Sequence, residues 1–254
     1  MGAGLSMGGM PLPVPVMPLV AVCPPLFLFV ISRVRRFLQR RATQASYRAL
    51  ASAKRSSVAT ALASARAAGL DWVGLVRWTA THSPASAPDA VLQLPARELC
   101  SQLSSGRLSS EYVTRVFVAQ TIKVDESLHC VAEQCFELAV KEAKKCDVER
   151  AEGRLRGSLH GLPISVKEQM RMSGFQTTCG ACCRLMDPPA QDTAVLVTLL
   201  KQAGAIPFVR TNVPQLLMLP ETFVRRGPCP PPRAPASLGQ GPLARRRSRA
   251  ACAC

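Results

Sequence analysis

The sequence predicts an α/β fold, and three successive patterns carry this prediction. Alternating apolar residues indicate a strand over 162–167. An apolar helical stretch follows, with Asp192 or Thr193 as its cap and Gly204 at the position after a helix where glycine is frequent. A second apolar run, 205–209, indicates another strand. Strand, helix and strand in this order imply a right-handed crossover and therefore a parallel sheet.

Three helices are predicted to precede these strands. The first covers 95–103. Ser109 or Ser110 caps the second, because a serine hydroxyl at this position accepts a hydrogen bond from a free backbone N–H group. The third helix is expected from about residue 127 to residue 152, where apolar residues recur on one side.

Residues 1–32 are predicted to form a membrane anchor. They contain no charged side chain, and the stretch 10–32 is long enough for a helix that crosses a bilayer, which takes about 20 residues. The arginines that follow are expected on the cytosolic side, so the rest of the chain is predicted to face the cytosol. A Pro-rich leader without fixed structure is the alternative.

The net charge of +16 belongs to the flanks of the chain, because all 16 acidic residues lie between Asp71 and Glu221. Residues 33–90 form a basic, Ala- and Ser-rich segment of helix and linker, whose charge favours anionic lipid head groups. A folded domain is expected over 91–223, and the Pro- and Arg-rich residues 224–254 are predicted to be disordered. Aromatic residues spaced for base stacking are absent, so no nucleic acid is expected as a partner.

The eleven cysteines show no spacing typical of a disulfide framework. Their densest group comprises Cys179, Cys182 and Cys183. Neither a second C-x-x-C nor a neighbouring pair of histidines accompanies this group, so no metal is predicted and reduced thiols are expected.

Lys167 ends the predicted strand 162–167 and shares a face with Ser165. A buried lysine without a partner is neutral, and a neutral lysine is a base. The alternative is a lysine whose side chain reaches water, which the spacing alone favours because lysine is seldom fully buried. The residues by themselves leave both interpretations open.

Three ordered stretches resemble the amidase signature family. They are LHGLPISVKE at 159–168, TTCGA at 177–181 and QDTAVLVTLLKQAGAIPFVRTNVPQ at 191–215. The form TNVPQ and the apolar N-terminus are most similar to the family members that hydrolyse fatty-acid amides. The resemblance covers about residues 94–217, and it is specific as an ordered set although each stretch alone is weak.

The resemblance implies N-terminal helices followed by the first part of an incomplete mixed sheet. It also implies a serine hydrolase with a Ser-Ser-Lys triad, in which Lys167 matches the catalytic lysine and moves a proton through a bridging serine. Ser165 has no role in this scheme and is expected to be structural. Leu217 and Met218 match positions at which relatives line the acyl channel.

Further implications concern ligands and location. The resemblance implies no metal or organic cofactor, a lipid amide as substrate, and a homodimer as in relatives. It also implies a location at the membrane of the endoplasmic reticulum with the domain facing the cytosol.

Both family serines belong to a Gly/Ser-rich signature that should follow TNVPQ, and the sequence shows none. We therefore expect a truncated, membrane-anchored amidase fragment with little or no activity, because removing members of a catalytic unit removes nearly all of the rate. The change of composition after Phe223 suggests that the tail derives from another reading frame or an intron. A non-catalytic, membrane-associated module that binds a lipid or a protein is the alternative function.

Overall fold

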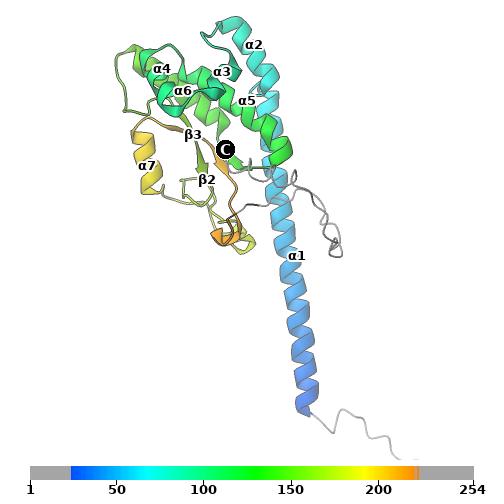
Figure 1. The fold of residues 1–254 in the computed structure, drawn as a ribbon. Helices are drawn as coiled ribbons and strands as arrows, with labels where there is room; N and C mark the ends of the chain where they lie inside the picture. The colour runs from blue at the N-terminus through cyan, green and yellow to red at the C-terminus, as the bar shows by residue number, and fades with distance from the viewer. Residues whose placement is uncertain (1–23, 221, 223–254) are drawn as a thin grey trace, which may run out of the picture. The chain divides into compact units, whose positions relative to one another are not determined.

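The computed structural model describes residues 24–220 and residue 222 (Figure 1). The chain divides into two compact units, residues 1–46 and residues 47–254. The tail that was predicted to be disordered, 224–254, lies outside the described residues.

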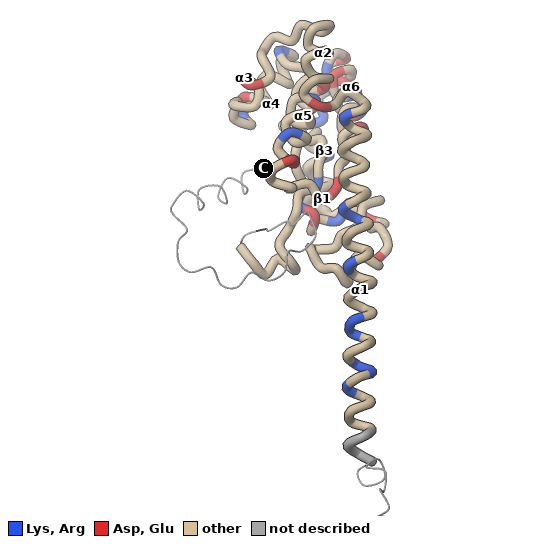
Figure 2. The backbone as a smooth tube through the Cα atoms, turned by 90° about the vertical axis from the view of Figure 1, so that its right-hand side faces the viewer, with Lys and Arg blue, Asp and Glu red and all other residues tan. Residues whose placement is uncertain are grey.

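The described part of the first unit is the beginning of helix α1 (Pro24–Ala67). The predicted membrane helix over 1–32 is wrong: within 24–220 and 222, no helix has an apolar stretch long enough to cross a membrane. The reason is that α1 carries arginine from Arg33 onward, soon after its start, whereas a bilayer needs about 20 apolar residues. Figure 2 shows these basic positions along α1. Residues 1–23 of the predicted anchor lie outside the described part.

The second unit contains the remainder of α1 and all of the other helices and strands that the structure describes. Its helices are α2 (Trp72–His82), α3 (Pro88–Gln93), α4 (Ala96–Ser105), α5 (Ser110–Leu128), α6 (Phe136–Ala151) and α7 (Val195–Gln202), with the 3-10 turns η2 (Cys182–Met186) and η3 (Gln215–Leu217). Its strands are β1 (Val131–Gln134), β2 (Pro163–Lys167) and β3 (Ile206–Thr211). The predicted α/β class is therefore correct for this unit.

The three strands form one mixed sheet in the order β1-β3-β2. β2 and β3 run parallel, as the strand–helix–strand pattern predicted, and β1 is antiparallel to β3. The register shifts within the parallel pair: Ile164 lies opposite Pro207, but Ser165 lies opposite Val209, so Phe208 has no cross-strand partner on β2. This bulge sets the positions of all later residues of both strands.

Local sequence signals account for several helix ends. The Ser109 hydroxyl accepts a hydrogen bond from Tyr112 N over 3.2 Å, which confirms the predicted cap of α5. Helix α7 is followed by Gly204 at a φ of 97°, as predicted. The predicted cap of α7 is wrong, because the helix begins after Ala194, and the Thr193 hydroxyl instead accepts a hydrogen bond from another loop.

The single helix predicted over 127–152 is wrong in its first part. Helix α5 ends at Leu128, and His129 turns the chain with a φ of 51°. The buried Asp125 carboxylate then accepts the Val131 N–H over 2.9 Å, and β1 begins there. The strand forms because β3 offers it a pairing partner, a tertiary contact that helical periodicity does not reveal.

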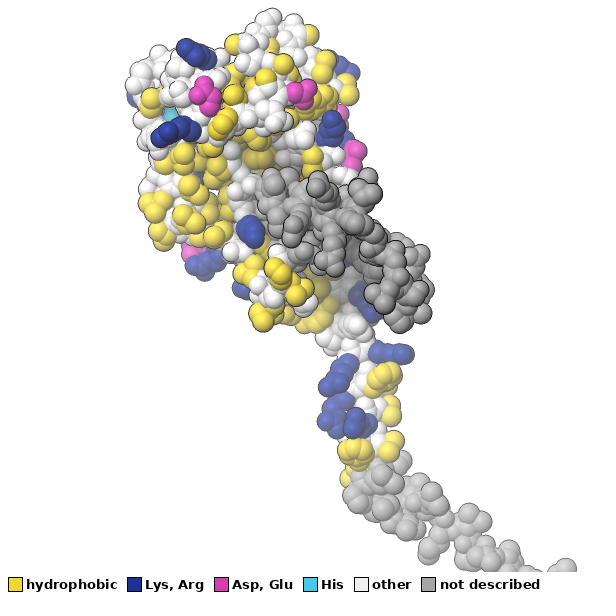
Figure 3. Space-filling model, viewed as in Figure 1, with side chains coloured by type: hydrophobic (Ala, Val, Ile, Leu, Met, Phe, Trp, Pro, Cys, Tyr) yellow, Lys and Arg dark blue, Asp and Glu magenta, His cyan; other side chains and the backbone are white. Residues whose placement is uncertain are grey.

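Helices α5 and α6 pack against each other and cover the sheet. The core between them includes Val118, Phe136 and Phe208, and the two phenylalanine rings lie 6.4 Å apart. A second apolar cluster joins α5 to α2, α3 and α4. Helix α7 buries Val197 but leaves three other apolar residues exposed, and it forms a hydrophobic patch in Figure 3; the exposed residues are Val195, Leu196 and Leu199.

Candidate functional site

The predicted catalytic lysine, Lys167, is the last residue of β2. It lies opposite Thr211 in the pairing with β3, so both residues are at the carboxyl ends of parallel strands. Ligand sites in open α/β sheets gather at these ends. The side chains of Lys167 and Ser165 are both exposed. Water therefore has access to the Lys167 amine in this part of the described chain.

Glu168 follows Lys167 directly and is 5% exposed. Its carboxylate accepts hydrogen bonds from the backbone N–H groups of Thr178 and Cys179, the latter over 2.9 Å. Such charge-assisted bonds are roughly twice as strong as bonds between neutral groups. Glu168 thus fixes the loop 174–184 against the end of β2. This role was not predicted, although an acid directly after a lysine at a strand end is a usable signal.

Arg210 of β3 is fully buried, with 0% exposure. Its guanidinium forms an ion pair with Glu133 of β1 and donates hydrogen bonds to the backbone carbonyls of Glu168, Met170 and Gln176. The bonds to Met170 and Gln176 measure 3.0 and 2.8 Å. A buried charge is tolerated when it is paired and hydrogen-bonded in this way. Arg210 therefore anchors the chain that leaves β2.

The chain that leaves β3 lies against the loop 174–184. Leu216 N donates a hydrogen bond to the Cys179 carbonyl over 2.8 Å. A Cβ atom on Gly180 would lie 3.0 Å from two backbone carbonyl oxygens of this segment, so the close approach requires glycine. The predicted acyl-contact residues, Leu217 and Met218, follow and are 45% and 80% exposed. The structure thus brings the two loops together and leaves these two side chains in solvent.

A pocket of about 140 Å³ lies next to the same loops. It is lined by Lys54, Arg55, Val58, Val131, Ala132, Glu133, Glu168, Thr178, Leu185 and Asn212. The Lys54 amine is paired with Glu133, so two opposite charges of the lining neutralise each other. Lys167 does not line this pocket, which is therefore a separate feature from the candidate lysine.

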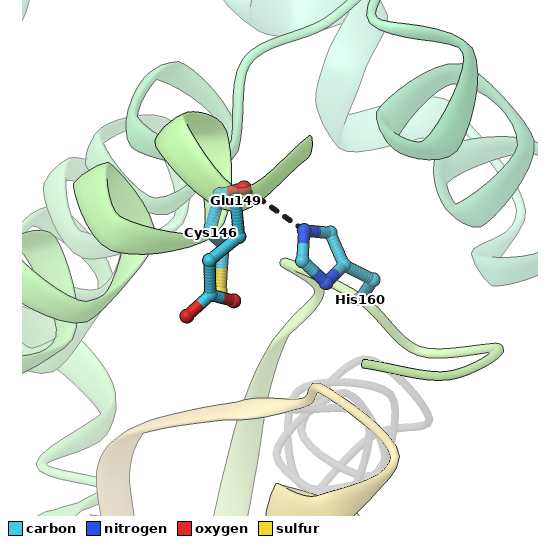
Figure 4. Close-up of side chains that lie close together, drawn as sticks. All are labelled: Cys146, Glu149 and His160. Atoms are coloured by element: carbon cyan, nitrogen blue, oxygen red, sulfur yellow. Dashed lines mark hydrogen bonds between the residues drawn. The ribbon is translucent and has the colours of Figure 1, made fainter. Parts of the chain in front are cut away.

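One group of side chains in the described residues has the composition of a metal site: Cys146, Glu149 and His160 (Figure 4). The ligand atoms of His160 and Glu149 are already engaged. His160 accepts a hydrogen bond from Arg156 N at Nδ1 over 3.1 Å, and its Nε2 lies 2.9 Å from the Cys146 carbonyl oxygen. Arg156 also binds both carboxylate oxygens of Glu149, which lowers the pKa of that carboxyl.

Burial raises the pKa of the Cys146 thiol to about 11, so the sulfur is protonated at neutral pH. A metal ligand must be a thiolate, and both imidazole nitrogens already have hydrogen-bond partners. The group is best described as a hydrogen-bonded junction between α6 and the turn before β2. It holds the amino end of β2 in place.

Comparisons with known proteins match this chain to amidases. The model of the Amidase family matches residues 112–236. Amidase 1 of Gibberella moniliformis is 34% identical over 138 residues, which are 54% of this chain and 26% of that protein. Fatty-acid amide hydrolase 1 of Sus scrofa is 37% identical over 127 residues, 50% of this chain and 20% of that protein.

A solved structure of a fatty acid amide hydrolase aligns with a TM-score of 0.51 and 30% identity. The alignment covers 53% of this chain and 24% of that one. The chain therefore spans about a quarter of the length of the relatives that it matches. Lys167, Glu168 and Arg210 all lie inside the matched residues 112–236.

Proposed function

We propose that this chain is part of an amidase, as the match of the Amidase family model to residues 112–236 indicates, and that Lys167 is the proton-transferring lysine of its amide-hydrolysing site. One observation carries the proposal: within the matched residues, Lys167 stands at the carboxyl end of a strand that is parallel to its neighbour. Glu168 and Arg210 support it, because they fix the backbone on the carboxyl side of this lysine.

The proposed chemistry needs a neutral amine. Lys167 is exposed in the described chain, so the proposal requires other groups to cover it and exclude water from the site. Lys167 then takes the proton of a serine nucleophile through a second serine and returns it to the leaving amine. No metal or organic cofactor takes part in this scheme.

Long-chain fatty-acid amides are the substrates that we propose, with a fatty acid and an amine as the products. Support comes from the similarity to the fatty-acid amide hydrolase of Sus scrofa. The exposed, apolar Leu217 and Met218 offer contact surface for an acyl chain.

Little or no turnover is proposed for this chain when it is tested alone. Of the three residues of the proposed triad, the lysine is the one with a counterpart in the motifs of this sequence. Catalytic units of this kind lose nearly all of their rate when one member is missing.

The test is labelling of the purified chain with a fluorophosphonate probe, together with turnover of a long-chain fatty-acid amide. The host must lack such enzymes. Background labelling is expected, unchanged in Lys167→Ala and in the control Lys201→Ala, which removes another exposed lysine. Strong labelling that Lys167→Ala abolishes and Lys201→Ala leaves intact would refute the proposed inactivity and support the role of Lys167. Strong labelling that survives Lys167→Ala would refute the role of Lys167.

Acyl-chain binding without hydrolysis is a second candidate function, favoured by the exposed run Leu216–Leu219. It predicts that a fluorescent fatty acid binds the chain and that the double variant Leu217→Ser, Met218→Ser weakens the binding. Val195→Ser, which changes another exposed apolar residue, on α7, serves as the control. Equal binding by all variants would refute this candidate.

Homodimerisation and a location at the endoplasmic reticulum, with the domain facing the cytosol, stay predictions.

A further inference from the structure

We propose that Cys179 and Cys182 form a peroxide-sensitive dithiol that closes to a disulfide. The two residues end a Cys-Gly-Ala-Cys sequence, the C-x-x-C spacing of redox-active thiol pairs. Both are free thiols; Cys179 is half-buried, whereas Cys182 is exposed. Both sulfur atoms are therefore within reach of a small oxidant.

A tight turn presents Cys179. Ala181 N donates a hydrogen bond to the Thr178 carbonyl over 3.0 Å and closes the turn. The central residues, Cys179 and Gly180, have φ values of 50° and 68°, the sign that a type I′ turn requires at both positions. Cys182 follows immediately as the first residue of η2. The backbone thus carries the two thiols on a turn and on the element that continues it.

Arg184 places a positive charge beside the Cys179 sulfur. Its Nη1 lies 3.7 Å from Sγ, and its Nε donates to the Asp187 carboxylate over 3.1 Å, which holds the guanidinium in position. The guanidinium thus lies where it can stabilise the negative charge of a sulfur that attacks a peroxide. Cys100 is also half-buried, but burial raises the pKa of its thiol, so it serves as an internal control.

The reaction has two balanced steps with hydrogen peroxide as the oxidant. The Cys179 thiolate attacks one peroxide oxygen, so that an S–O bond forms and the O–O bond breaks. Sulfur is oxidised to sulfenic acid, and hydroxide leaves. The Cys182 thiol then attacks the Cys179 sulfur; the S–S bond forms, the S–O bond breaks, and the hydroxyl departs as water with the thiol proton.

The turn that changes on oxidation touches both loops of the candidate site. Cys179 donates its backbone N–H to Glu168, and its carbonyl accepts the Leu216 N–H over 2.8 Å. Gly180 is packed against the backbone of the same segment. Disulfide formation within the turn therefore alters the support of Leu216. The inference is independent of the proposed amidase function, because it requires no turnover.

The experiment treats the full chain with hydrogen peroxide, alkylates the remaining thiols and digests with trypsin. Cleavage at the arginines leaves all three cysteines of the loop in one peptide, residues 172–184. The expected product has lost two hydrogen atoms and carries one alkyl group, on Cys183. Alkylation of all three cysteines after treatment would overturn the proposal, and so would a disulfide to Cys183 or oxidation of Cys100 before Cys179.

Matched variants separate the role of Cys179, which is oxidised first, from that of Cys182, which closes the disulfide. Cys182→Ser is expected to leave a sulfenic acid on Cys179 that dimedone traps, whereas Cys183→Ser is expected to form the disulfide normally. Arg184→Gln should slow the loss of the Cys179 thiol several-fold, and Arg184→Lys should restore part of the rate. An unchanged rate in Arg184→Gln would refute the role of this cation. Hydrogen exchange of the Leu216 amide should accelerate after oxidation in the parent chain and stay unchanged in Cys182→Ser.

Discussion

At the amino end of β2, the His160 side chain is buried and hydrogen-bonded. At the carboxyl end of β2, the backbone is fixed, but the Lys167 side chain is in solvent. His160 is 2% exposed and has a hydrogen-bond partner at each ring nitrogen. Lys167 is exposed and has neither an ion pair nor a side-chain hydrogen bond to any residue that the structure describes. One end of the strand therefore serves stability, and the other holds a side chain available for chemistry.

The largest effect on stability is expected from Arg210→Met, which removes the side chain that anchors the backbone at the carboxyl end of β2. The change leaves Glu133 with one cation fewer and several carbonyls without a donor, so the free energy of unfolding should fall by about 3–5 kcal/mol. Urea unfolding measures it. Arg171→Met, which breaks an exposed ion pair with Asp192, should cost at most about 1 kcal/mol. Similar losses in the two variants would contradict the structural role of Arg210.

Gly204→Ala tests how much the packing around His160, at the amino end of β2, contributes to stability. Gly204 has a φ of 97°, and an added Cβ atom would lie 2.5 Å from the Cα of His160. We expect a loss above the roughly 1–2 kcal/mol of left-handed strain alone. Gly174→Ala is the matched control, because its φ is 83° but nothing lies within 4 Å of the added atom. Equal thermal stabilities of the two variants would show that the contact with His160 is unimportant.

Glu149→Gln is expected to lower the free energy of unfolding by a smaller amount, which depends on pH. The bond from Arg156 lowers the pKa of Glu149 below 4.5, so the stabilising contribution is present above pH 4.5 and is lost as the pH falls through the lowered pKa. Because the pair is partly exposed, we expect a loss of about 0.5 kcal/mol at pH 7 that disappears in acid. Urea unfolding at several pH values checks this, and a loss that grew in acid would have the wrong sign.

The smallest effect is expected for Lys167→Met. Since the side chain is exposed and unpaired among the described residues, the free energy of unfolding should change by less than about 0.5 kcal/mol. Chemical denaturation of parent and variant side by side measures it. A loss several times larger would mean that Lys167 supports the fold, and the contrast between the two ends of β2 would disappear.

Local signals predicted the parallel strands and the lysine at the end of one of them. Strand β2 and the glycine after α7 depend on neighbouring residues, so their patterns are visible in the sequence. Strand β1 was missed because its cause is the pairing with β3, far along the chain. The buried Arg210 was missed for the same reason: its partners come from β1 and from the loop after β2.

The candidate site was predicted only in part. The motif identified Lys167, but the exposure of its side chain depends on which elements cover the end of β2, and periodicity does not show this. Glu168 acts through backbone amides ten or more positions away, so its role depends on the path of the loop. The membrane helix was predicted from the uncharged residues 1–32. Helix α1 instead begins at Pro24 and continues through the arginines that follow residue 32.

The bulge at Phe208 keeps two positive charges apart. Because β3 contains this additional residue, Val166 is paired with Arg210. Lys167 is paired with Thr211. If the pairing continued without the bulge, Arg210 would lie opposite Lys167, and the guanidinium and the amine would be direct cross-strand neighbours. Like charges in that arrangement repel each other. The bulge thus allows one cation to be buried in the sheet while the other remains in water at its edge.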